Sequence, residues 1–182
     1  MNEINRDKLF EHFISKIETG FQIFAILDSA RRPEIAWKPY EFLSEWVSLY
    51  KGEPEESLVD VAPYLINLSK GDKPNLDLVK WISNDCFGDS CSIFIYSQAN
   101  IETLLKHFQQ FLIVTDESSK AFYFRFYDPR VLRIYLPTCN EDELKTFFGP
   151  TDMFVMENEE LTSLIEFSVV NNKLLTNSSL IN

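Results

Sequence analysis

The stretch FQIFAILD, residues 21–28, decides the fold class of this chain, because it is apolar almost throughout and ends in Asp28. Short apolar runs of this kind are typical of strands that are buried on both faces of a sheet. A second run, CSIFIYS at residues 91–97, is rich in β-branched and aromatic side chains, which favour strands. The two runs therefore predict a sheet within the core of the molecule.

Helical patterns lie on both sides of these two runs along the chain. Apolar residues recur at helical spacing over residues 4–19 and again over residues 76–84. Three further helices are predicted to begin at polar residues, because such side chains accept hydrogen bonds from the first free backbone N–H groups of a helix. These starts are Asn100, Asp128 before Pro129, and Asn140, whose helix should end at Gly149.

The other apolar segments are predicted to be strands. Residues 46–50 and 61–68 are two of them, and Pro63 places the second near a sheet edge or at a strand start. Residues 111–128 predict a hairpin around the polar sequence DESSK, and residues 153–171 predict a terminal hairpin, followed by a polar tail.

These elements predict an α/β fold of the mixed α+β kind, with a mixed β-sheet flanked by helices in one compact domain. A chain of 182 residues is long enough to bury about 70% of its surface on folding. We assign residues 1–20 to an N-terminal helix and residues 21–150 to the main part of the domain. Residues 151–182 are assigned to C-terminal strands and a polar tail of the same domain.

Composition restricts the classes of partner. The formal net charge of -11 argues against nucleic acid and against an anionic membrane surface, since both require a basic face. No run approaches about 20 apolar residues, and the N-terminus lacks the pattern of a signal peptide. The three cysteines are at no metal-ligand spacing. We therefore expect a cytoplasmic protein with free thiols that binds neither membranes nor nucleic acid.

The usual catalytic and cofactor motifs are missing from the sequence. The two histidines form no HExxH pair, and no GxSxG motif occurs. The five glycines build no phosphate-binding loop. We therefore expect no metal, no cofactor and no enzymatic activity.

One polar cluster stands out, FRFYDPR at residues 124–130. Asp128 can cap the helix that begins at Pro129, and an arginine of the cluster can pair with Asp128 or with Asp28. The same charges can instead contact a partner. Catalysis would also need a nucleophile or a proton shuttle with a pKa near neutral, and the cluster supplies neither.

Several stretches, taken together and in order, resemble a known family. They are FAILDSARRPEI (24–35), SLYKG (48–52), VAPYLINL (61–68), FGDSCSIFIYS (87–97), FLIVTDE (111–117) and FYFRFYDPRVLRIYLPTCNEDELKTFFGP (122–150). The set resembles the effector chaperone (adaptor) domain of bacterial type VI secretion systems, long catalogued as a domain of unknown function. The resemblance covers about residues 21–150.

The resemblance implies a cytoplasmic adaptor that is neither secreted nor an enzyme. Such a protein binds a toxic effector and promotes its loading onto the spike protein of the secretion machine, contacting the spike directly or through the effector. The family's patterns fall on six candidate residues, whose role is either partner binding or maintenance of the fold: Asp28, Arg31, Arg125, Tyr127, Asp128 and Arg130.

Two alternatives stay open beside the adaptor. A small hydrolase or transferase would use Asp28 and Asp128 with the arginines, and would bring them together in a solvent-open pocket. An immunity-type protein would bind the toxic domain of an effector rather than its delivery segment. An adaptor should instead expose an apolar groove or patch.

Overall fold

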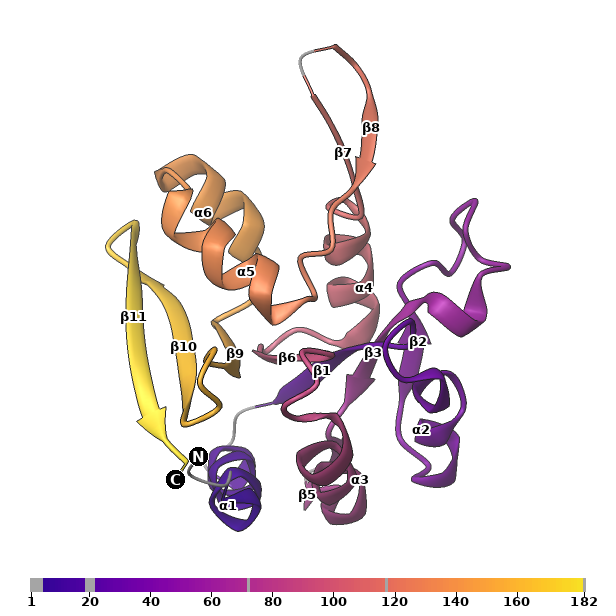
Figure 1. Ribbon diagram of the computed structural model, residues 1–182, viewed down its shortest axis with the longest axis vertical. Helices are drawn as coiled ribbons and strands as arrows, with labels where there is room; N and C mark the ends of the chain where they lie inside the picture. The colour runs from indigo at the N-terminus through magenta and orange to yellow at the C-terminus, as the bar shows by residue number, and fades with distance from the viewer. Residues whose placement is uncertain (1–4, 19–21, 72, 117, 182) are drawn as a thin grey trace.

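A computed structural model describes residues 5–18, 22–71, 73–116 and 118–181. Within these ranges the core is a seven-stranded sheet in the order β11-β10-β9-β6-β1-β3-β2 (Figure 1). Every pairing in it is antiparallel. The strands are β1 (Ile23–Asp28), β2 (Trp46–Ser48), β3 (Pro63–Asn67), β6 (Ser92–Tyr96), β9 (Met153–Glu157), β10 (Ser163–Val170) and β11 (Lys173–Leu180).

The two apolar runs are neighbours in the middle of this sheet, as strands β1 and β6. All six residues of β1 and all five of β6 are buried, which confirms the expectation for FQIFAILD within its described part. Strand β1 also pairs with β3, whose first residue is Pro63, opposite Asp28. A strand start is a position where the missing N–H of proline is tolerated.

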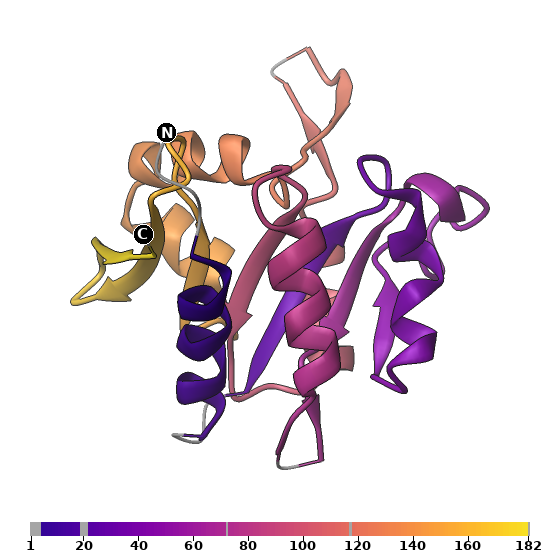
Figure 2. The same cartoon turned by 60° about the horizontal axis from the view of Figure 1, so that its bottom comes forward.

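Helices cover both faces of the sheet. The helices α1 (Arg6–Glu18), α2 (Lys38–Glu41) and α3 (Leu76–Trp81) lie on one face (Figure 2). The helices α4 (Ile101–Gln109), α5 (Pro129–Tyr135) and α6 (Glu141–Phe148) lie on the other. Short helical turns join these elements: η1 (Pro33–Ala36), η2 (Val59–Val61), η3 (Ile82–Cys86) and η4 (Leu136–Thr138). Among the described residues, no helix is long and apolar enough to cross a membrane.

The predicted helix starts are confirmed by their caps. The side chain of Asn100 accepts a hydrogen bond from the Thr103 N–H, and the side chain of Asn140 forms a reciprocal capping box with Glu143. Helix α6 ends at Gly149, where φ is +47° and a Cβ atom would lie 2.3 Å from Cε1 of His107. Only glycine fits this position.

Phenylalanine fills the layer between the sheet and the helices α4, α5 and α6. The ring of Phe126 lies 5.5 Å from that of Phe108 and 5.8 Å from that of Phe147, and Phe147 lies 5.4 Å from Phe154 on strand β9. All four side chains are buried. The abundance of phenylalanine in the sequence therefore serves the core in this layer.

The predicted fold class is confirmed, with two differences in detail. The sheet is antiparallel at every described pairing rather than mixed, and the side-chain pattern of a buried strand does not distinguish these arrangements. The polar tail was a wrong prediction, because most of it forms strand β11. An edge strand pairs on one side only, so polar side chains are tolerated along it. Just beyond β11, the carbonyl of Ile181 accepts a hydrogen bond from the Asn5 N–H at 2.9 Å.

Two small hairpins stand outside the main sheet. Strands β4 (Ser69–Lys70) and β5 (Lys73–Pro74) pair as a short antiparallel hairpin. Strands β7 (Ile113–Thr115) and β8 (Ala121–Tyr123) form the hairpin predicted around DESSK. This second hairpin projects away from the helices (Figure 1).

Candidate functional site

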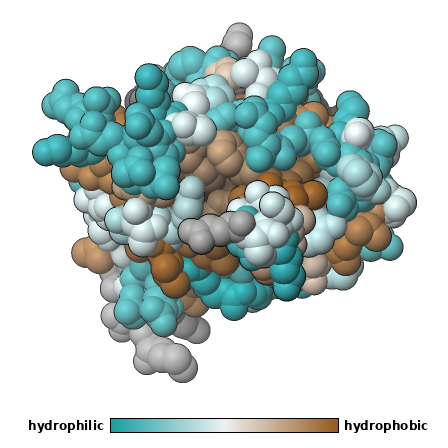
Figure 3. Space-filling view, turned by 90° about the horizontal axis from the view of Figure 1, so that it is seen from above, coloured by the Kyte–Doolittle hydropathy of each residue, from teal (hydrophilic) through white to brown (hydrophobic). Residues whose placement is uncertain are grey.

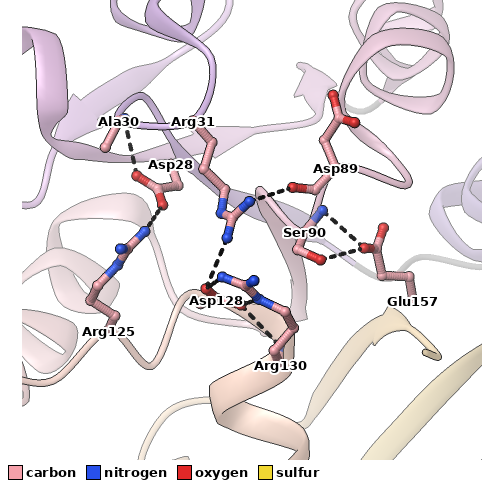
Figure 4. A network of polar contacts seen from close by, with 9 residues as sticks. All are labelled: Asp28, Ala30, Arg31, Asp89, Ser90, Arg125, Asp128, Arg130 and Glu157. Atoms are coloured by element: carbon pink, nitrogen blue, oxygen red, sulfur yellow. Dashed lines mark hydrogen bonds and ion pairs between the residues drawn. The ribbon is translucent and has the colours of Figure 1, made fainter.

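Buried carboxylates gather at one end of the sheet. Strand β1 ends in Asp28 and strand β9 ends in Glu157, while strand β6 begins between them. The loop that precedes β6, residues 87–91, therefore lies between the two acids, and the Asp28 N–H donates to the Cys91 carbonyl at 2.9 Å. The residues before helix α5 complete the group from the other direction (Figure 4).

Asp28 is fully buried and forms an ion pair with Arg125. Its second carboxylate oxygen accepts a hydrogen bond from the Ala30 N–H at 3.1 Å. The guanidinium of Arg125 also lies over the ring of Tyr127, 5.9 Å from its centroid. Burial raises the pKa of the Tyr127 phenol and of the neighbouring Tyr50 phenol. Arg125 is thus fixed on two sides.

Asp128 is the second buried carboxylate, with only 2% of the residue exposed. It accepts from the Arg130 backbone N–H and Nε, both at 3.0 Å, and from Arg130 Nη2 at 2.6 Å. Nη2 of Arg31 lies 3.7 Å from Oδ2 of Asp128. Burial alone would raise the pKa of Asp128, but the hydrogen bonds and charges of Arg130 and Arg31 outweigh it and lower that pKa.

Glu157 is a third member of the network, and the sequence analysis missed it. One of its oxygens accepts from the Gly88 N–H at 2.6 Å, and the other from the Ser90 N–H at 3.0 Å. Burial raises the pKa of this carboxyl group above its ordinary value. A signal was present in the sequence, because the apolar run MFVME ends in an acid, as FQIFAILD does.

Arg31 joins the two halves of the network. It donates from Nη1 to the Asp89 carbonyl at 3.1 Å and approaches Asp128 with Nη2. The structure thus brings all six candidate residues to one end of the sheet, and it realises both pairings that the sequence left open. Arg125 pairs with Asp28, and Arg130 pairs with Asp128.

This arrangement joins segments that lie far apart in the sequence. Both aspartates are buried and each is ion-paired with an arginine, and Asp128 also borders the hollow described below. The Cys91 thiol lies inside the fold and donates to the Cys86 carbonyl at 3.0 Å. Within the described residues, no group of three or more histidine, cysteine or acidic side chains is arranged to hold a metal ion.

A hollow of about 610 Å³ opens beside Asp128, along helix α5. We call it the α5 hollow. Its lining residues come from α5 and the segments that flank it: Asp128, Arg130, Val131, Ile134, Tyr135 and Thr138. Two residues, Asp128 and Arg130, belong to both the network and the hollow.

Exposed apolar side chains are concentrated on the β7–β8 hairpin. Ile113, Val114, Phe122 and Tyr123 are between 40% and 58% exposed. Val114 pairs with Phe122, and Ile113 with Tyr123, so each pair lies on a different face of the hairpin. Seen along the hairpin, a group of hydrophobic side chains lies near the middle of this side of the molecule, with hydrophilic ones around much of it (Figure 3).

Hydrogen bonds support the hairpin at its turn and near its base. The Asp116 carboxylate accepts hydrogen bonds from the backbone N–H groups of Ser118, at 2.9 Å, and Lys120, at 3.0 Å. The Tyr123 hydroxyl donates to Glu55 at 2.7 Å. A further group of exposed apolar side chains lies around α2, comprising Trp37, Tyr40 and Leu43.

Comparison with known proteins gives one family. A family model described as "Domain of unknown function (DUF4123)" matches residues 23–146. The match runs from strand β1 into helix α6 and contains all six candidate residues. No curated protein and no solved structure matches the chain.

Proposed function

Since the chain belongs to the DUF4123 family, which is associated with adaptors of type VI secretion effectors, we propose that it is such an adaptor. In this proposal it binds a cognate secreted effector in the bacterial cytoplasm and promotes loading of that effector onto the spike protein. It acts by binding and catalyses no reaction.

The observation that carries the proposal is the β7–β8 hairpin. A two-stranded hairpin is at best marginally stable alone, and both faces of this one carry exposed apolar side chains. Exposed apolar side chains grouped on one element in this way are a common feature of protein contact sites. Because Asp116 and Glu55 already hold the hairpin in shape, a partner loses little entropy in ordering it.

The polar network anchors the segment that follows the hairpin in the chain. Two residues after strand β8, the chain reaches Arg125, which is paired with the buried Asp28. Asp128 then starts helix α5. We therefore assign the family's most recognisable residues a positioning role. They fix the segment from which the hairpin projects, and the hairpin makes the contact.

Affinity capture from the native bacterium tests the proposal. The whole chain serves as bait in cells that express their secretion system, and mass spectrometry identifies the bound proteins. We expect a toxin-like effector together with the spike protein. Recovery of neither would contradict the adaptor function.

A matched pair of variants tests the hairpin itself. Val114→Ser with Phe122→Ser removes apolar surface from one face of the hairpin, and Leu175→Ser with Leu180→Ser removes exposed leucines from strand β11. We expect the first pair of substitutions to abolish capture and the second to leave it unchanged. Capture that requires only the isolated toxic domain of the effector would indicate an immunity protein instead.

A further inference from the structure

We propose that the α5 hollow binds a partner segment in which a large apolar side chain stands next to a carboxylate. This inference rests on the proposed function for the source of the segment, an effector or spike protein. Its chemistry follows from the hollow alone.

The apolar half of the hollow is unusual for a short helix in a folded domain. Ile134 is 73% exposed, although Leu132 on the same helix is fully buried. Val131 and Tyr135 extend the apolar lining along the helix. A volume of about 610 Å³ lies within the range of roughly 300–1,000 Å³ that is typical of ligand sites. The hollow therefore has room for a large apolar side chain and its neighbours.

The charged half of the hollow is Arg130, held in one orientation. Its Nε and Nη2 atoms donate hydrogen bonds to the buried carboxylate of Asp128, and 53% of the Arg130 side chain is exposed. Among the described residues, Nη1 has no acceptor. An arginine fixed by a buried acid presents its outer N–H groups to a carboxylate at reduced cost in side-chain entropy.

The distribution of charge selects an acidic group. The side chains of Asp28 and Asp128 are at most 3% exposed, whereas those of the paired Arg125 and Arg130 are 43% and 53% exposed. The acids are thus covered and the guanidiniums face outward, although the chain carries a net charge of -11. A free phosphate would leave the apolar lining without a partner.

Selection from a library of random 12-residue peptides displayed on phage tests the inference, with the full chain as target. We expect enriched sequences in which Leu, Ile, Met or Phe lies within two positions of Asp or Glu. Synthetic copies of these peptides, labelled with fluorescein, then give affinities by anisotropy. Enrichment of basic peptides, or of none, would overturn the inference.

Three variants locate the binding. Arg130→Gln and Ile134→Glu should each weaken binding of the selected peptides about tenfold or more, equivalent to roughly 1.4 kcal/mol. The control Leu43→Glu, at an equally exposed apolar position near α2, should not. Because Ile134 is exposed, Ile134→Glu is expected to fold even if Arg130→Gln does not. Peptides that bind Ile134→Glu as tightly as the original chain would refute the site.

The two proposals fail in different ways. Capture of an effector and the spike, combined with a failed selection, would remove the α5 hollow as a site and keep the adaptor. A successful selection with no effector or spike captured would support the ligand chemistry of the hollow and contradict the adaptor.

Discussion

The polar network and the β7–β8 hairpin are neighbours along the chain, yet they are opposite in character. The network consists of buried carboxylates, each paired or hydrogen-bonded, and it joins segments up to 97 residues apart. The hairpin has two three-residue strands whose side chains are all exposed. The network contains the recognisable residues of the chain, and the hairpin offers the surface that can meet a partner. A family signature can therefore mark the support of a binding surface rather than the surface itself.

The sharpest test of this contrast removes the counter-charge of Asp28. Arg125→Met keeps most of the side-chain length but leaves a fully buried carboxylate without its ion pair. Because the Arg125 side chain is 43% exposed, we expect the free energy of unfolding to fall by about 2–3 kcal/mol, less than for a fully buried pair, measured by urea denaturation. Adding Asp28→Asn to this variant should restore part of the loss, because the buried charge is then gone. A loss below about 1 kcal/mol would mean that the network does not brace the fold.

A smaller loss of stability is expected when Asp128 is replaced. Asp128→Ala removes the cap of helix α5 and the partner of Arg130, and should lower the free energy of unfolding by about 1–2 kcal/mol. Thermal melting with a partner-binding assay separates the two possible roles of this residue. Unchanged melting with lost binding would move Asp128 from the network to the interface.

Acid should weaken the contribution of Asp128. Its pKa is lowered in the folded protein, so the ionised carboxylate stabilises the fold above its ordinary pKa of about 3.9, and this stabilisation is lost as the pH falls through the lowered value. Asp128→Asn should therefore be less stable than the original chain at pH 7, and the difference should shrink as the pH falls below about 4. Denaturation curves of both proteins at several pH values measure this difference in stability. A difference that does not change with pH would contradict the ion pair.

The smallest effect on stability is expected in the hairpin. Phe122→Ser replaces an exposed side chain, so the free energy of unfolding should change by no more than about 0.5 kcal/mol. Capture of the effector should nevertheless weaken. Thus the two regions should respond in opposite ways, with stability lost in the network and binding lost in the hairpin. A hairpin variant that unfolds the protein would erase the distinction.

Local features of the fold could be predicted because they depend on residues close in sequence. The caps at Asn100 and Asn140 each act on an N–H three residues ahead, and Asp128 precedes Pro129 directly. The burial of β1 and β6 follows from their own side chains. These signals fixed most of the elements and the α+β class.

Glu157 depends on a partner that is far away along the chain. Its carboxylate accepts from the Gly88 N–H across 69 residues, and the acid at the end of MFVME indicates a strand end without identifying that partner. Strand β11 was read as a tail because polar side chains at a sheet edge resemble those of a loop. The β7–β8 hairpin was predicted, but its exposure depends on what the rest of the fold leaves uncovered.

The order of the strands and the hydrogen bond between Asn5 and Ile181 determine which contacts can form early and which must form late during synthesis. Strand β1 emerges first from the ribosome, and on one side the sheet then grows outward in the order of translation, through β6, β9, β10 and β11. On this side of the sheet, each strand is translated after the strand with which it pairs on its inner edge. The hydrogen bond from Asn5 is the exception, since its acceptor, the Ile181 carbonyl, is translated after every strand of the sheet. The residue just before helix α1 can therefore form this bond only once β11 has been translated.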